Sequence, residues 1–342
     1  MKKSISMLTY AVLFSVGIAS AQSNYKIVNK IHIDGDEGWD LLAMDESTSR
    51  LFLSHGRIVQ VVDVKNGKLI GTIPDTKGVH GIALSTDLNK GYTSNGKDSS
   101  VTVFNLKTLA VIKKIPVTGR NPDAILYDEF THKVFVYNGR SSNATVIDAT
   151  SDKVVGTIPL DGKPELSVTD GKGKIYVNLE DKSMVSMIDA KTLKVEQTWS
   201  VAPGIEPSGI AIDNKNHRLF IVCDNKLMVV MNAQTGQVIT TLPIGEHVDG
   251  VAYDPIKKRV YSSNGEGTVT VVQEGNENTF KIIENIVTQK GAKTIAINTK
   301  THHLYLTTAE FGITPEPTKE KPKPRLSIKP NTFVVLDVAP IK

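Results

Sequence analysis

One pattern of strands is repeated seven times along the chain, and this repeat constrains the fold more than any other feature. Each copy has a turn, a polar residue, a short apolar strand and then three more strands. The polar residues of the seven copies are Asp40, His80, Asp123, Glu165, Ser208, Asp249 and Lys293. The steps between them are 40, 43, 42, 43, 41 and 44 residues. A steady period of about forty residues with four strands per unit is typical of a β-propeller blade. We therefore predict an all-β, seven-bladed β-propeller made of four-stranded antiparallel blades.

The two ends of the chain are predicted to share one blade. The last repeat has no fourth strand, because only residues 338–342 follow Asp337. Residues 26–33 match the fourth-strand pattern and precede the first repeat. We expect this N-terminal strand to close the last blade, since closure removes an open sheet edge. Deletion of residues 22–33 should then destabilise the whole ring.

Residues 1–21 have the pattern of a secretory signal peptide. Lys2 and Lys3 begin it, residues 5–18 are mostly apolar and uncharged, and Ala19-Ser20-Ala21 fits a cleavage site. We expect cleavage after Ala21 and a periplasmic or secreted protein. Residues 22–342 form a single domain in this prediction, because blades are too thin to be stable alone. Cys223 is the only cysteine, so no intrachain disulfide is expected.

Two recurring residue types within the repeats are predicted to be structural. An aromatic residue recurs in the second strands, as at Tyr92 and Phe135, and should pack between adjacent blades. Asp or Asn ends most third strands, as at Asp63 and Asn105. Such residues bond to the backbone of the turn that follows, which makes them hairpin residues and not catalytic ones.

A long insertion interrupts the last repeat. Residues 311–331 contain five prolines and several lysines, which predict an extended surface loop. Loops of this length in a compact domain are usually functional or disordered. The insertion lies between the second and third strands of its blade, so we expect it at the mouth of the ring, where it would act as a lid.

The seven polar opening residues are predicted to converge, because the first strand of each blade lines the propeller axis. The turns between second and third strands form a wider ring on the same face and include His55 and Arg140. His247 lies just before one opening. The predicted ligand-binding residues are Asp40, His80, Asp123, Glu165, Ser208, His247, Asp249, Lys293, His55 and Arg140.

Charge at this mouth is unbalanced, since the opening residues sum to −3 with a neutral His80. Such a rim should raise the pKa of some carboxylates, protonate His80 or attract a cation. Polar residues at a wet channel mouth also fit a purely solvating role, and this alternative stays open. No fixed metal-ligand spacing and no phosphate loop occur, so we predict no metal site and no cofactor.

Catalysis receives little support from the sequence. Ser208 is the only hydroxyl among the opening residues, and no Gly-x-Ser-x-Gly elbow surrounds it, so no catalytic residue is predicted. The net charge is +4, which is too small to indicate nucleic-acid binding by itself.

The strands also resemble a known family. Tyr92-Thr93-Ser94-Asn95, Tyr176-Val177-Asn178 and Tyr261-Ser262-Ser263-Asn264 resemble the Tyr-Val-Thr-Asn repeat of the YVTN family of β-propellers. The phrase at residues 155–160 is also typical of it. The resemblance covers residues 24–340 and is closest to exported YncE-like members. It implies a seven-bladed ring, often exported, with no agreed enzymatic role. Some relatives have been linked to DNA binding.

Three functions follow as hypotheses. The first is an exported, monomeric, non-enzymatic binding or scaffold propeller whose mouth face engages a small molecule or a protein. The second is a lactonase-like hydrolase, because seven-bladed rings also support that chemistry. The third is nucleic-acid binding through Arg57, Lys97, Arg140 and the basic insertion.

Overall fold

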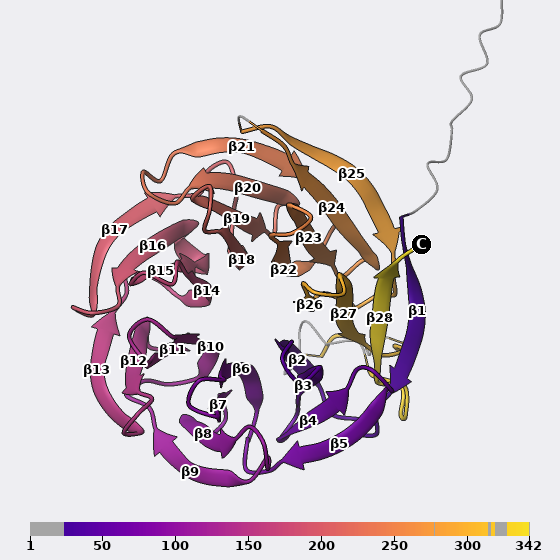
Figure 1. The fold of residues 1–342 in the computed structure, drawn as a ribbon, viewed down its shortest axis with the longest axis horizontal. Coiled ribbons are helices and arrows are strands. Elements are labelled where there is room, and N and C mark those ends of the chain that lie inside the picture. The colour runs from indigo at the N-terminus through magenta and orange to yellow at the C-terminus, as the bar shows by residue number, and fades with distance from the viewer. Residues whose placement is uncertain (1–23, 277, 314–315, 319–326, 342) are drawn as a thin grey trace, which may run out of the picture.

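The computed structural model describes residues 24–276, 278–313, 316–318 and 327–341. Within them the chain forms seven four-stranded sheets arranged as blades of a ring (Figure 1). Every strand pair described is antiparallel, which confirms the predicted seven-bladed propeller. The predicted signal peptide lies outside the described residues.

The strands follow the predicted repeat closely. The first four blades are β2–β5 (Trp39–Asp45, Arg50–His55, Ile58–Asp63, Lys68–Ile73), β6–β9 (Val79–Ser85, Lys90–Asn95, Ser100–Asn105, Val111–Pro116), β10–β13 (Pro122–Asp128, Lys133–Asn138, Asn143–Asp148, Lys153–Pro159) and β14–β17 (Pro164–Thr169, Lys174–Leu179, Met184–Asp189, Lys194–Ser200). The last three are β18–β21 (Pro207–Asp213, Arg218–Cys223, Leu227–Asn232, Val238–Pro243), β22–β25 (Val248–Asp254, Arg259–Asn264, Thr268–Glu274, Phe280–Val287) and β26–β28 (Ile295–Asn298, His303–Thr308, Val334–Pro340) with β1 (Tyr25–His32).

The N-terminal strand closes the ring as predicted. β1 pairs with β28 over seven residue pairs, from Tyr25 opposite Pro340 to His32 opposite Val334. The last sheet therefore has the order β1-β28-β27-β26 (Figure 1). Tyr25 also reaches the neighbouring blade, where its hydroxyl lies 2.9 Å from that of Tyr261. Closure thus joins the two ends of the chain by both backbone pairing and buried side chains.

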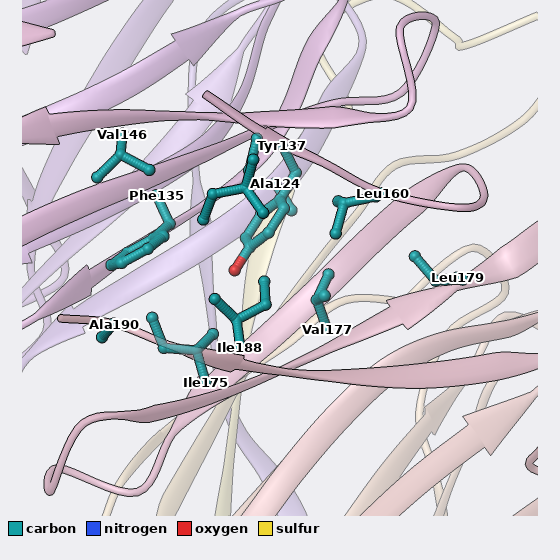
Figure 2. Packing of buried hydrophobic residues seen from close by; sticks show 12 residues of the cluster. Ala124, Phe135, Tyr137, Val146, Leu160, Ile175, Val177, Leu179, Ile188 and Ala190 are labelled. Carbon is teal, nitrogen blue, oxygen red and sulfur yellow. The ribbon is translucent and has the colours of Figure 1, made fainter. Parts of the chain in front are cut away.

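Apolar side chains between neighbouring blades form the core. Figure 2 shows Phe135 and Tyr137 of one blade facing Ile175 and Ile188 of the next, all of them buried. Between the first two blades, the rings of Phe52 and Phe104 lie 5.9 Å apart. Burying one such side chain contributes roughly 1.5–3 kcal/mol. The recurring aromatic residues of the second strands therefore pack between blades, as predicted.

The residues that end the third strands also have the predicted role. Asp63 accepts a hydrogen bond from the backbone of Lys65, and Asn105 accepts one from the backbone of Lys107. Cys223 is buried and free. In the part of the chain that the structure describes, the one helix is a short 3₁₀ turn at Glu180–Lys182, and no helix could cross a membrane.

Candidate functional site

The first strand of each blade is the innermost one, so the seven opening residues surround one axis (Figure 1). We call these residues the mouth ring: Asp40, His80, Asp123, Glu165, Ser208, Asp249 and Lys293.

A β-bulge recurs at six of these positions. In β2, for example, Trp39 pairs with His55 and Leu42 pairs with Leu53, so one extra residue is inserted at Asp40–Leu41. The same irregularity occurs at the start of β6, β10, β14, β18 and β22. A bulge bends a strand and redirects its side chains. The repeat therefore presents one polar side chain per blade at a locally irregular strand start.

Three members of the mouth ring meet directly. His80 Nδ1 lies 2.7 Å from Asp40 Oδ2 and 3.6 Å from Asp123 Oδ1. One oxygen or nitrogen from each of the three side chains lies within 4.8 Å of the other two. All three side chains are half-buried. Residues that are 40 and 43 positions apart in the sequence thus form one cluster.

The pKa values of His80 and Asp123 in this cluster both differ from their ordinary values. Burial alone would lower the pKa of His80, but the hydrogen bond with Asp40 and the charges of Asp123 and Glu165 raise it overall. Burial raises the pKa of Asp123, with a further contribution from the charge of Asp40, against the opposing effects of His80 and Lys163. His80 therefore tends to carry a proton between two carboxylates. The directions of these pKa shifts agree with the expected effect of an acidic rim, with burial as the largest cause for Asp123.

Glu165 lies in a second charged group of the mouth. Lys163 Nζ lies 2.6 Å from Glu165 Oε1 and also bonds to Glu180. Burial raises the pKa of Glu165, and the negative charge of Asp123 raises it further, although Lys163 opposes the shift. This group adds two carboxylates and one ammonium to the mouth, so the local charge remains negative.

A third group contains Asp249 and Lys293, which form an ion pair. They line a hollow of about 300 Å³ whose remaining walls include three further acids and two other polar residues. The full lining is Glu180, Glu206, Ser208, Asp224, His247, Val248, Asp249 and Lys293. Four carboxylates thus face one lysine and one histidine in this hollow. The structure brings the predicted residues Ser208, His247, Asp249 and Lys293 together.

Charges act across the ring as well as around it. Asp40 and Glu180 both contribute to raising the pKa of Asp249, behind the larger effect of burial and against Lys293. Asp249 in turn contributes to raising the pKa of Asp123. Residues of blades one, three, four and six therefore share one electrostatic environment, and together they favour a positively charged partner.

Hydroxyl groups of the second strands hold the backbone of the mouth ring. Ser54 Oγ accepts a hydrogen bond from the backbone N–H of Asp40 at 3.0 Å. Ser94 Oγ donates to the carbonyl of Asp123, and Ser263 Oγ donates to that of Lys293. The latter two bonds connect neighbouring blades. The opening residues are therefore fixed by the scaffold before any ligand binds.

Two predicted residues lie apart from these groups. His55 is buried, with Nδ1 at 2.6 Å from Gln60 Oε1 and Nε2 at 2.9 Å from the carbonyl of Glu37. Its position in β3 corresponds to Asn95 in β7, whose side chain likewise bonds to the third strand of its own blade. Both ring nitrogens of His55 are thus engaged by the first blade and the loop before it, and the ring packs against Phe333 of the seventh blade, with 4.3 Å between the ring centres. Arg140 is exposed on the wider rim.

The stem of the long insertion reaches the mouth beside Asp40. Phe311 and Ile328 form an antiparallel bridge, and the backbone N–H of Gly312 donates to the carbonyl of Ser327. The ring of Phe311 lies 6.2 Å from that of Trp39, which directly precedes Asp40. Residues 314–315 and 319–326, which make up about half of the predicted lid, lie outside the described residues.

The predicted ligand-binding residues leave out Lys163, Glu180, Glu206 and Asp224, although the turns that contain Glu180 and Asp224 belong to the wider ring that the sequence predicts on the same face. A signal was present for two of them, because Lys163 and Glu206 each stand two residues before an opening residue, as His247 does. Glu180 and Asp224 follow second strands, and their contribution to the mouth depends on turn conformations that the repeat does not specify. The missed residues are mostly acidic, which strengthens the predicted charge of this face.

No protein-family model matches the chain, and no curated protein matches its sequence. Its fold does match solved structures. A chain of Kuenenia stuttgartiensis hydrazine synthase is 18% identical with a TM-score of 0.71, over 80% of this chain and 94% of that one. A structure of U3-55K is 11% identical with a TM-score of 0.74, over 92% and 98% of the two chains. The WD40 repeats of RRP9 are 10% identical with a TM-score of 0.75, over 92% and 97%.

These likenesses establish the fold alone. The chain is a seven-bladed β-propeller of the same architecture as the WD40 repeats of RRP9. A shared fold does not carry a shared activity, so any function must be argued from the mouth itself.

Proposed function

We propose that this protein is a non-enzymatic binding propeller whose mouth receives a positively charged group of a small molecule or of a protein partner. The observation that carries the proposal is the hollow lined by Glu180, Glu206, Asp224 and Asp249, with Lys293 as its only lysine. Its volume of about 300 Å³ is in the range of small-molecule sites. Burial raises the pKa of Asp249, and the charges of Asp40 and Glu180 raise it further. A cation entering the hollow would offset this repulsion.

Two features of the mouth favour binding over catalysis. Ser208 is buried, and its hydroxyl donates to the carbonyl of Val248 at 3.4 Å; among the described residues, no general base is hydrogen-bonded to it. The backbones of Asp40, Asp123 and Lys293 are held by hydroxyl groups. A pre-formed, charged rim reduces the entropy that a ligand must lose on binding.

The test uses a matched pair of probes, spermidine as a trication and citrate as a trianion. Spermidine should raise the melting temperature of the protein, and citrate should not. The double variant Glu165→Gln/Asp249→Asn should lose most of the spermidine effect, because two mouth carboxylates become neutral. A control double variant, Glu129→Gln/Glu196→Gln, removes the same formal charge outside the mouth and should keep it. An equal shift in both double variants, or no shift in the wild type, would contradict the proposal.

The finer identity of the chain is also part of this proposal: an exported, YncE-like member of the YVTN family, working as a monomer. The repeats at Tyr92–Asn95 and Tyr261–Asn264 support it, since Asn95 and Asn264 both bond to hydroxyls of the third strand in the same way. Export rests on the pattern of residues 1–21. Mass spectrometry of the mature protein should give Gln22 as its first residue.

One observation favours nucleic acid as a second candidate ligand. Arg57, Lys77 and Lys97 line a hollow of about 540 Å³ between the first two blades, on the rim that also carries Arg140. Arg57 is partly neutralised, because it pairs with Glu37 at 3.3 Å. Binding through this rim would weaken steeply with salt. Affinity for single-stranded DNA that does not change between 50 and 200 mM salt would exclude it.

A further inference from the structure

The cluster of Asp40, His80 and Asp123 differs from the rest of the mouth, because it mixes one imidazole with two carboxylates. Its closest atoms are His80 Nδ1 and one carboxylate oxygen of each aspartate, at 2.7 Å and 3.6 Å from the imidazole nitrogen. Ligand atoms that share a divalent ion at about 2.0–2.2 Å lie roughly 3–4 Å from one another. The three side chains are therefore close to the spacing of a metal site without any change in the backbone.

The neighbouring cations of the mouth are committed to other carboxylates. Lys163 bonds to Glu165 and Glu180, and Lys293 pairs with Asp249. Asp40 and Asp123 thus have His80 as the basic side chain between them, and a protonated imidazole offsets only one of their two charges. A divalent ion would neutralise both carboxylates.

The His80 imidazole is also positioned with its Nδ1 toward Asp40 and Asp123. Its Nε2 lies against Gly96, where an added Cβ would come within 2.7 Å of that nitrogen. The absence of a side chain at Gly96 therefore leaves the space that the His80 ring occupies. The backbone carbonyl of Asp40 accepts a hydrogen bond from Thr294 Oγ1 at 2.9 Å, and that of Asp123 accepts one from Ser94. All three candidate ligands are thus positioned by groups outside the cluster.

We propose that Asp40, His80 and Asp123 bind one divalent transition-metal ion, with Zn²⁺ as the reference ion, through His80 Nδ1 and one oxygen of each carboxylate. Nitrogen and oxygen ligands of this kind suit zinc and its neighbours in the first transition row. Three protein ligands leave at least one coordination position for water or for a donor atom of the ligand. The inference rests on the proposed function, because it concerns the same mouth and adds a metal anchor to it.

The test measures zinc directly. Protein purified without a polyhistidine tag is treated with a chelator, dialysed, and titrated with Zn²⁺ by calorimetry, with the metal content determined by mass spectrometry. We expect one Zn²⁺ per chain. His80→Gln and Asp123→Asn should each weaken binding about 100-fold or more, since loss of a direct ligand should exceed the effect of losing an outer one. The spectrum of the Co²⁺ form should change in the same variants.

Two further variants separate ligation from structure. His303→Gln removes a comparable His–Asp pair, with Nδ1 at 2.6 Å from Asp337 Oδ1, in the seventh blade. It should leave zinc affinity unchanged. Gly96→Ala keeps all three ligands but displaces the imidazole, and it should weaken zinc binding while the protein stays folded by thermal denaturation.

The outcomes distinguish this inference from the proposed function. Glu165→Gln/Asp249→Asn leaves the three ligands in place and should still bind one Zn²⁺, even as it loses the spermidine effect. A wild type that binds no zinc, or His80→Gln and Asp123→Asn variants that bind it as tightly as the wild type, would overturn the metal site. Neither result would change the outcome of the spermidine test, so the proposed function is tested separately.

Discussion

Three of the inner strands carry an aspartate at each end, and the two ends differ sharply. β2 has Asp40 and Asp45, β10 has Asp123 and Asp128, and β22 has Asp249 and Asp254. Within each pair the residue type and the strand are the same, and only the end of the strand changes. In β22 the Asp249 side chain is 22% exposed and that of Asp254 is 0% exposed.

The aspartates at the strand ends away from the mouth (the far end), Asp45, Asp128 and Asp254, are the more buried ones, yet each accepts hydrogen bonds from neighbouring groups. Asp254 accepts hydrogen bonds from the backbone of Ile256 and Lys257 and contacts His302 Nδ1 at 2.6 Å. Asp45 is bonded by Ser47 and Thr48, and these bonds lower its pKa although burial would raise it. The far end therefore provides its carboxylates with hydrogen-bond donors from the adjoining turns.

The mouth aspartates have fewer donors and more like-charged neighbours. Burial raises the pKa of Asp123 and of Asp249, and nearby carboxylates raise both further. The comparison teaches that burial of an acid does not by itself mark a functional site. A partly exposed acid whose charge the fold leaves poorly compensated is the better candidate, because only a ligand can complete its interactions.

The largest expected effect comes from a deletion that opens the ring, on which both ends of every inner strand depend. Deletion of residues 22–33 exposes the edge of β28 and removes the buried side chains of Tyr25, Ile31 and Ile33. Each contributes roughly 1.5–3 kcal/mol, so the three together should contribute roughly 4.5–9 kcal/mol. That is comparable to the stability of a whole domain, and circular dichroism should show global unfolding. Unfolding confined to the last blade, seen as protected amides elsewhere by hydrogen exchange, would contradict this expectation.

An intermediate effect compares the two ends of one strand. Asp254→Ala should lower the free energy of unfolding by about 2–4 kcal/mol, because it leaves two backbone N–H groups and the half-buried His302 without their acceptor. Asp249→Ala removes only a half-exposed ion pair and should change stability by less than about 1 kcal/mol. Urea denaturation measures both. Equal losses would mean that the two ends do not differ as described.

The smallest effect is a pH dependence that sharpens the contrast. Because the pKa of Asp123 is raised, the folded protein binds that proton more tightly than the unfolded chain does. Stability is therefore lost as the pH rises from the unfolded value of about 4 through the raised folded pKa. Asp123→Asn removes this loss, so the variant should be more stable than the wild type at pH 7, by on the order of 1 kcal/mol or less.

The control for this prediction lies at the far end of the same strand. The gain from Asp123→Asn should vanish near pH 3, where the carboxyl is protonated in both states. Asp128→Asn should instead destabilise the protein at pH 7, since Asp128 accepts bonds from Thr131 and Thr169. Thermal denaturation from pH 3 to pH 8 would follow both variants. A destabilising Asp123→Asn at pH 7 would reverse the assignment of the mouth end.

Much of the fold could be predicted because the repeat is a local property of the chain. The alternation of apolar and polar residues fixes each strand, and the constant period fixes the number of blades. The closure by residues 26–33 followed from counting strands. The candidate site was predicted only in outline. The sequence predicts His55 to be a ligand-binding residue of the wider ring, but both of its ring nitrogens contact groups of its own chain region, Gln60 and the carbonyl of Glu37.

The sequence by itself determined that seven equivalent strands surround one axis and that their first residues are polar, since the period and the pattern are written residue by residue. Tertiary structure decided which of those residues touch. His80 reaches Asp40 and Asp123 because bulges at the strand starts and a glycine at position 96 place the ring between them. Contacts across blades depend on small displacements of the backbone, and a pattern that only repeats every forty residues does not encode them.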